Sequence, residues 1–154
     1  MTYIIAEVGV NHNGDIKIAE ELIKIAADAG ADAVKFQAWK AKNLVTHDAP
    51  LATYQEKNTG ASISQFEMLK GLELTTKDHE KLIQVCLENN IEYLCSAFDI
   101  EGLKMLDTLG IKKFKIPSGE ITNLPYLRKI GSLNGHIIMS TGMADLGEIE
   151  SAIR

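Results

Sequence analysis

The stretch Phe114-Lys115-Ile116-Pro117-Ser118-Gly119-Glu120 places a lysine, a serine and a carboxylate at the end of an apolar, β-prone run. Lys115 lies inside a predicted strand at residues 113–116, and Pro117 and Gly119 end that strand. A lone lysine in a strand is typical of a sheet edge, where the side chain points to water. The same pattern recurs along this chain, which favours a shared role for the polar groups.

Four other short apolar runs also end in polar side chains. Such runs are typical of parallel strands that are buried on both faces. They are predicted at residues 3–8, 33–37, 92–96 and 136–139, and their polar residues are Glu7, Lys35, Gln37, Ser96, Asp99, Ser140 and Thr141. All five runs therefore carry their polar groups at the carboxyl end.

Composition excludes several classes of protein. The 154 residues, 45% of them hydrophobic and 24% charged, suffice for one ordinary domain with a sizeable core. A net charge of −5 argues against a generic nucleic-acid binder. No apolar run approaches the ~18 residues of a membrane span, and no signal-peptide pattern opens the chain. Cys86 and Cys95 are predicted to be buried thiols in a reducing compartment, so we expect a cytoplasmic protein without a membrane partner.

Helix signals alternate with the predicted strands. Asp15, Thr75 or Thr76, Asp99, Asn123 and Asp145 each precede a segment with helical spacing of apolar residues. Residues 38–74 show no sustained period, although residues 63–72 are predicted to hold a short helix. A loop of this length in a compact domain usually has a function or is poorly ordered.

Successive βα units predict a parallel α/β domain. No glycine-rich phosphate loop follows the first strand, because Gly9 and Gly14 are separated by Val-Asn-His-Asn. Polar groups at the ends of all strands favour a (β/α)8 TIM barrel over an open sheet. A barrel needs eight strands, and the chain supplies about five, so we expect residues 1–154 to be the incomplete N-terminal part of a barrel.

The predicted barrel brings cations, hydroxyls and carboxylates together at its carboxyl edge. Charge-assisted hydrogen bonds from lysines and serines suit a small dianion that bears phosphate and carboxylate groups, and two glutamates could transfer protons. The residues concerned are Lys35, Lys115, Ser118, Ser140, Glu7 and Glu120. A structural salt-bridge lattice inside the barrel is the alternative interpretation.

Five motifs resemble the N-acetylneuraminate (sialic acid) synthase family in order and spacing. They cover essentially the whole chain: Ala6-Glu7-Val8-Gly9-Val10-Asn11-His12-Asn13-Gly14, Val34-Lys35-Phe36-Gln37, Tyr54-Gln55-Glu56-Lys57-Asn58-Thr59-Gly60, Lys115-Ile116-Pro117-Ser118-Gly119-Glu120 and Met139-Ser140-Thr141-Gly142-Met143. The resemblance implies condensation of phosphoenolpyruvate with an N-acylated hexose, N-acetylmannosamine in the commonest case. The products are a nine-carbon keto acid and free phosphate.

The resemblance also assigns roles to individual residues. Lys35, Lys115, Ser118 and Ser140 match residues that hold the phosphate and carboxylate of phosphoenolpyruvate. Ser96 stands where relatives have threonine in Ser-Thr-Pro-Phe, whereas this chain has Cys95-Ser96-Ala97-Phe98 and lacks the proline. Glu7 and Glu120 match catalytic acidic residues, and Gln37 and Asn58 are further candidates for substrate contact.

The family's metal and second domain are expected to lie outside this chain. The resemblance implies a divalent ion, Mn²⁺ or Mg²⁺, held by two histidines on later strands, and a carboxyl-terminal antifreeze-like domain that reaches across a homodimer. His12 is interpreted as a turn histidine, because no second ligand lies at useful spacing. Without the metal's Lewis-acid role we expect residues 1–154 alone to show less than ~1% of full-length turnover.

Two other functions fit the same residues. A related synthase could make legionaminic, pseudaminic or another nonulosonic acid, which a product assay with different hexosamines would distinguish. A noncatalytic fragment could instead only bind anions. Calorimetric titration with phosphoenolpyruvate tests whether the anion site exists.

Overall fold

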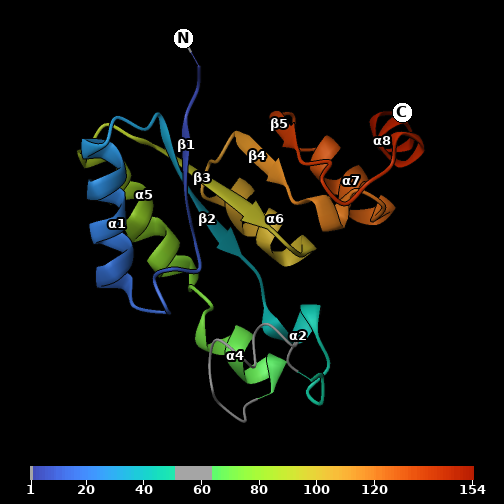
Figure 1. The fold of residues 1–154 in the computed structure, drawn as a ribbon, viewed down its shortest axis with the longest axis horizontal. Coiled ribbons are helices and arrows are strands. Elements are labelled where there is room, and N and C mark those ends of the chain that lie inside the picture. The colour runs from blue at the N-terminus through green and yellow to red at the C-terminus, as the bar shows by residue number, and fades with distance from the viewer. Residues whose placement is uncertain (1, 51–63) are drawn as a thin grey trace.

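The computed structural model describes residues 2–50 and 64–154. Within them, parallel strands form one sheet in the order β1-β2-β3-β4-β5, so neighbours in the sequence are neighbours in the sheet (Figure 1). The strands are β1 (Ile5–Gly9), β2 (Ala33–Ala38), β3 (Glu92–Ala97), β4 (Lys113–Ile116) and β5 (His136–Met139). This sequential order is the one that a (β/α)8 barrel requires.

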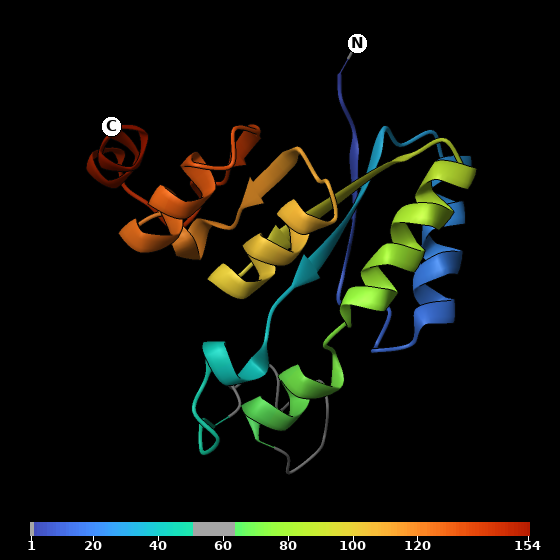
Figure 2. The same ribbon diagram turned by 180° about the vertical axis from the view of Figure 1, so that it is seen from behind.

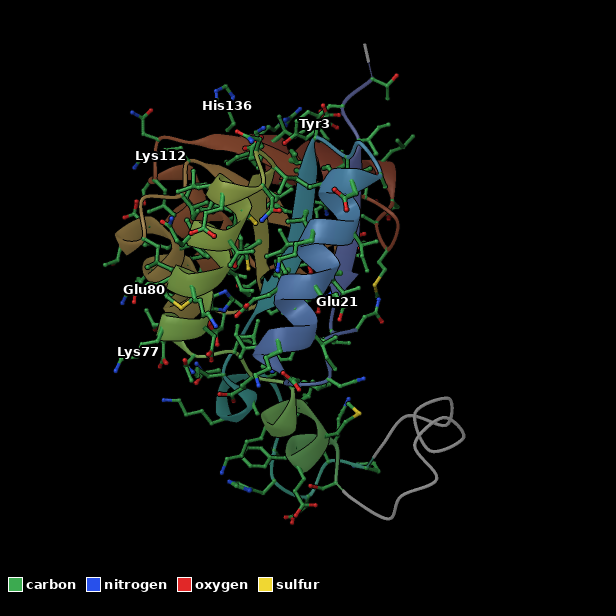
Figure 3. All side chains as sticks on the ribbon, turned by 90° about the vertical axis from the view of Figure 1, so that its left-hand side faces the viewer. Tyr3, Glu21, Lys77, Glu80, Lys112 and His136 are labelled. Atoms are coloured by element: carbon green, nitrogen blue, oxygen red, sulfur yellow. The ribbon has the colours of Figure 1, made fainter. Side chains whose placement is uncertain are left out.

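Helices connect the strands and lie against the sheet. The connecting helices are α1 (Ile16–Asp28), α5 (Thr76–Glu88), α6 (Ile100–Thr108) and α7 (Leu124–Gly131), with α8 (Leu146–Ile153) after β5. Figure 3 shows α1 and α5 side by side, and an ion pair between Lys81 and Glu20 joins them. In the described part of the chain, no helix combines the length and apolarity needed to cross a bilayer.

The helix starts predicted from single residues are confirmed. Each start is stabilised by a side chain that accepts a hydrogen bond from a free backbone N–H of the first turn. These side chains are Asp15, Thr75, Asp99, Asn123 and Asp145. The strand bounds differ from the predicted ones by at most two residues. β1 begins at Ile5 rather than Tyr3, and β1, β2 and β3 each extend one residue further.

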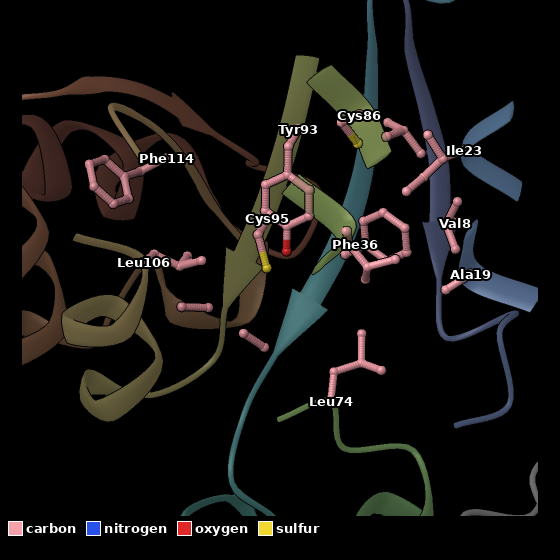
Figure 4. Close-up of a cluster of buried hydrophobic side chains, with 14 of the residues drawn as sticks. Val8, Ala19, Ile23, Phe36, Leu74, Cys86, Tyr93, Cys95, Leu106 and Phe114 are labelled. Atoms are coloured by element: carbon pink, nitrogen blue, oxygen red, sulfur yellow. The ribbon is translucent and has the colours of Figure 1, made fainter. Parts of the chain in front are cut away.

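The core lies between the sheet and the helices (Figure 4). Phe36 of β2 stacks on Tyr93 of β3, with ring centroids 5.6 Å apart. Cys86 and Cys95 are buried free thiols, as predicted, and burial raises the pKa of each to about 12. Neither cysteine is therefore a reactive thiolate at neutral pH.

The predicted long loop between β2 and α5 contains helices. Its described part holds α2 (Ala41–Leu44) and α4 (Gln65–Gly71), the latter within the predicted range 63–72. Figure 2 shows both beyond the carboxyl end of β2. The end of α4 packs closely on the turn after β1, because a Cβ at Gly14 would lie 2.3 Å from the backbone oxygen of Gly71.

Candidate functional site

Strand register brings the predicted polar residues onto one face of the sheet. Glu7 pairs with Lys35, Gln37 pairs with Ser96, and Ser96 pairs with Lys115 across three neighbouring ladders. Side chains at paired positions of parallel strands point to the same face. The opposite face of β2 and β3 carries Phe36 and Tyr93, which pack into the core.

Lys35 links β1 to β3 at the carboxyl edge. Its Nζ lies 2.5 Å from Glu7 Oε2 and donates a hydrogen bond of 3.3 Å to Ser96 Oγ. Gln37 Nε2 donates a long hydrogen bond of 3.4 Å to Glu7 Oε1. The Lys35 side chain is 13% exposed and that of Glu7 47%, so the cation is enclosed while its partner reaches solvent.

Lys115 extends the same group toward β5. Its ammonium donates to the backbone oxygen of Ile116 at 3.0 Å and to Ser140 Oγ. Burial lowers the pKa of Lys115, the nearby Lys35 lowers it further, and Glu7 opposes both effects. Glu7, Lys35, Gln37, Ser96, Lys115 and Ser140 therefore form one group, which we call the strand-end cluster.

The strand-end cluster has more cations than its anion can neutralise. Glu7 pairs with Lys35, whereas among the described residues no ion pair involves Lys115. The contacts of Lys115 are to neutral oxygens. A closed salt-bridge lattice would balance both ammonium groups, so this geometry favours the binding of an anion.

Two predicted site residues stand apart from the cluster. Ser118 and Glu120 lie in a short 3₁₀ helix, η1 (Ser118–Glu120), directly after β4. Glu120 Oε2 accepts a hydrogen bond of 2.7 Å from Asn123 Nδ2. In residues 2–50 and 64–154, no hydrogen bond or ion pair joins Ser118 or Glu120 to the cluster. Asn58 lies outside the described residues.

The described residues do not by themselves fit a divalent metal. Within them, no three His, Cys, Asp or Glu side chains gather into a group that could hold an ion. His12 is buried, and its Nδ1 accepts a hydrogen bond of 3.0 Å from the N–H of Gly14. Burial lowers the pKa of His12. These contacts agree with its interpretation as a turn residue.

Two carboxylates that bind the start of α2 were not assigned a site role from the sequence. Asp99 Oδ2 accepts a hydrogen bond of 2.9 Å from the N–H of Lys40, and Glu73 Oε1 accepts one of 2.6 Å from the N–H of Ala41. The sequence placed Asp99 among the polar groups at a strand end and predicted that it caps a helix, but it indicated no role in the site. Its position three residues beyond Ser96 at a strand end was the available signal, and Glu73 carried none.

Comparison of the sequence with models of known protein families identifies the family of this chain. The NeuB family model matches residues 22–154. The chain belongs to the NeuB family. This membership confirms the resemblance that the sequence motifs indicated.

Relatives of this NeuB-family chain include synthases of nonulosonic acids. It is 57% identical over 152 residues to the N,N'-diacetyllegionaminic acid synthase of Campylobacter jejuni, covering 99% of this chain and 46% of that protein. It is 49% identical to the synthase of the same name from Legionella pneumophila, covering 98% of this chain and 42% of that protein. The chain thus spans less than half the length of these relatives.

A solved structure supports the fold of the NeuB-family chain. The N-acetylneuraminic acid (sialic acid) synthetase of Leptospira borgpetersenii superimposes with a TM-score of 0.82 at 32% identity, covering 98% of this chain and 48% of that one. The overlap confirms the predicted α/β barrel fold, of which the sheet described above supplies the first five strands.

Proposed function

We propose that residues 1–154 are the N-terminal part of a phosphoenolpyruvate-dependent nonulosonic acid synthase. The observation that carries the proposal is the strand-end cluster, in which two ammonium groups and two hydroxyls lie together with a single carboxylate. Phosphoenolpyruvate carries a phosphate and a carboxylate, and the excess positive charge of the cluster suits such an anion. Family membership supports the same reaction class.

The residues have distinct roles in this proposal. Lys35 and Lys115 bind the anionic groups of phosphoenolpyruvate, and Ser96, Ser118 and Ser140 donate hydrogen bonds to them. Glu7 and Glu120 transfer protons at the reacting carbons, because Glu7 belongs to the strand-end cluster and Glu120 lies directly after β4. Gln37 orients Glu7 through its hydrogen bond to Oε1. Asn58 contributes a substrate contact.

The other components are proposed to come from the rest of a full-length protein. A divalent ion, Mn²⁺ or Mg²⁺, would be held by residues outside those described. The resemblance supports a homodimer that uses a carboxyl-terminal antifreeze-like domain, and the buried free thiols of Cys86 and Cys95 support a cytoplasmic location. Light scattering on the full-length protein measures the oligomeric state, and a monomeric mass would contradict the dimer.

The sugar acceptor defines two candidate products. N-acetylmannosamine would give N-acetylneuraminate, the commonest reaction of the family. Identity of 57% to a diacetyllegionaminic acid synthase, against 32% to the Leptospira sialic acid synthetase, favours a six-carbon sugar with two acetamido groups instead. A product assay with both sugars, and with a pseudaminic acid precursor, separates these candidates.

Calorimetric titration with phosphoenolpyruvate tests the anion site. We expect binding to the unsubstituted full-length protein and at least a tenfold rise in Kd for Lys115→Ala, since a charge-assisted hydrogen bond contributes about 1.5–3 kcal/mol. Lys112→Ala is the matched control, because Lys112 is an exposed lysine just before the amino end of β4. Equal loss in both variants, or no loss in either, would overturn the proposal.

A further inference from the structure

Helix α2 begins without a capping side chain of its own. The residue before it is Lys40, which makes no side-chain capping bond. The free N–H groups of Lys40 and Ala41 donate instead to Asp99 and Glu73, which lie 59 and 32 residues away in the sequence. The start of α2 is therefore determined by tertiary contacts.

Asp99 continues the ladder between β2 and β3 after the backbone pairing ends. The last backbone hydrogen bond of this edge runs from Phe98 N–H to the oxygen of Ala38, at 2.9 Å. Beyond it, Asp99 Oδ2 accepts from Lys40 N–H and from Asn43 Nδ2 at 3.0 Å. Asp99 as a residue is 9% exposed, so water does not compete strongly for these bonds.

Glu73 binds the start of α2 to the segment that follows α4. Its Oε2 lies 3.3 Å from Lys40 Nζ, while its Oε1 accepts from Ala41 N–H. Trp39 Nε1 adds a hydrogen bond of 3.2 Å to the oxygen of Leu69, within α4. Asp99 and Glu73 thus bind residues 40–43, and Trp39 joins the same segment to α4. We call this set of contacts the carboxylate clamp.

We propose that Asp99 and Glu73 are positioning residues of the synthase, because the carboxylate clamp holds α2 and α4 beyond the carboxyl ends of the strands (Figures 1 and 2). This inference rests on the proposed function. The contacts of the strand-end cluster come from the strands and the residue directly after β5. A hexose that reacts with phosphoenolpyruvate must lie outward from that cluster, toward α2 and α4. The clamp therefore acts on the sugar rather than on phosphoenolpyruvate.

Asp99→Asn separates the clamp from the helix cap. The amide oxygen still accepts from Gly102 N–H, which Asp99 Oδ1 does now at 2.6 Å, and asparagine caps helices as well as aspartate. The amide nitrogen, however, faces the donors of Lys40 and Asn43. In the full-length protein we expect kcat/KM for the hexosamine to fall about tenfold or more, with the Kd for phosphoenolpyruvate changed less than about twofold. Hydrogen exchange at Lys40 and Ala41 should become faster.

Two further variants make the test specific. Asp145→Asn changes another helix cap, whose oxygen accepts from Glu148 N–H at 2.9 Å, and should leave turnover and exchange at Lys40 unchanged. Asn43→Asp added to Asp99→Asn restores an acceptor for the new amide and should recover several-fold of the lost kcat/KM. Recovery would not follow from a general loss of stability.

The possible results distinguish this inference from the proposed function. Unchanged kcat/KM in Asp99→Asn, a parallel loss of phosphoenolpyruvate binding, or no recovery in the double variant would overturn the positioning role. If the unsubstituted protein binds no phosphoenolpyruvate and converts no hexosamine, the proposed function fails. Amide exchange at Lys40 then still decides whether the clamp exists.

Discussion

Lys35 and Lys115 are the same residue type on neighbouring parts of the sheet, but their hydrogen-bond and ion-pair partners differ. Both are lysines in strands, yet Lys35 is paired with Glu7 and Lys115 donates to neutral oxygens. Two ammonium groups near one another repel, and burial adds a desolvation cost, so an incoming anion would relieve both. Glu7 competes with that anion for Lys35.

Glu7→Gln should separate binding from catalysis. Removing the negative charge frees Lys35, so we expect the Kd for phosphoenolpyruvate to stay equal or decrease. Turnover of the full-length protein should fall by about 100-fold or more, because the amide cannot transfer a proton. Calorimetry and phosphate release measure the two quantities. A higher Kd for phosphoenolpyruvate together with reduced turnover would instead show that Glu7 organises the anion site.

His79 is a buried titratable group outside the cluster. Its Nδ1 lies 2.6 Å from Tyr93 Oη, and its Nε2 has no hydrogen-bond partner among the described residues. Burial lowers the pKa of His79 to about 4, although the nearby Asp78 opposes this. In the unfolded chain the His79 imidazole binds a proton near pH 6.5, whereas in the folded protein it stays neutral down to about pH 4. Stability is therefore lost as the pH falls from about 6.5 to about 4.

His79→Gln should reduce this pH dependence. Between pH 7 and pH 5, we expect the unsubstituted protein to lose about 2 kcal/mol more unfolding free energy than the variant does. Urea unfolding at each pH measures the difference. The same variant at pH 8 reports the structural cost of the substitution alone. Parallel pH curves would show that His79 is protonated in the folded protein.

At the scale of elements, helix ends and turns connect the layers. The turn after β1 contains Gly14 at φ 79°, and Gly30 ends α1 with the same angle. Both glycines adopt a conformation that is strained for other residues. Only Gly14 also approaches another element, since Gly71 belongs to α4. The packing of α4 on this turn therefore depends on the absence of a side chain.

Gly14→Ala and Gly30→Ala form a matched pair. Gly30→Ala should cost about 1 kcal/mol of stability from the backbone angle alone, because nothing lies within 4 Å of the added Cβ. Gly14→Ala should cost about 3 kcal/mol, because the methyl group also displaces the backbone of α4. Urea unfolding measures both. Equal costs would show that α4 does not pack on the turn in solution.

At the scale of the whole molecule, the segment that follows β5, including α8, exposes apolar side chains. Met143 is 76% exposed, Leu146 84% and Ile153 72%. Exposed apolar residues gathered in one region mark a surface that other protein covers. The relatives are more than twice as long as this chain. In the proposed full-length synthase, the further elements of the barrel would cover this surface.

Residues 1–154 alone should show less than ~1% of the turnover of the full-length protein. The proposed metal would be held by residues outside those described, and transition-state stabilisation by a metal is worth several kcal/mol. Phosphate release with phosphoenolpyruvate and each hexosamine measures the activity. The full-length protein at equal concentration is the control. Comparable turnover by both would show that the described strands already contain the complete active site.

Much of the fold follows from patterns within a few residues. Helix starts at Asp15, Thr75 and Asp145 depend on a side chain reaching an N–H two or three positions later, so the sequence alone predicts them. Alternation along each strand likewise predicts that Lys35 and Gln37 share a face. The family motifs then indicated which of these polar groups belong to a site.

Contacts between distant segments required the tertiary structure. Nothing near Lys40 in the sequence indicates that its N–H is bound by Asp99, and nothing near Gly14 indicates the approach of Gly71. Such pairs depend on the path of the whole chain, because each partner is a common residue that satisfies many local patterns. The sequence alone therefore determined the strands, the caps and the candidate site residues. Only the tertiary structure decided that Lys35 is paired with Glu7, that Lys115 has no ion-pair partner among the described residues, and that two carboxylates hold α2.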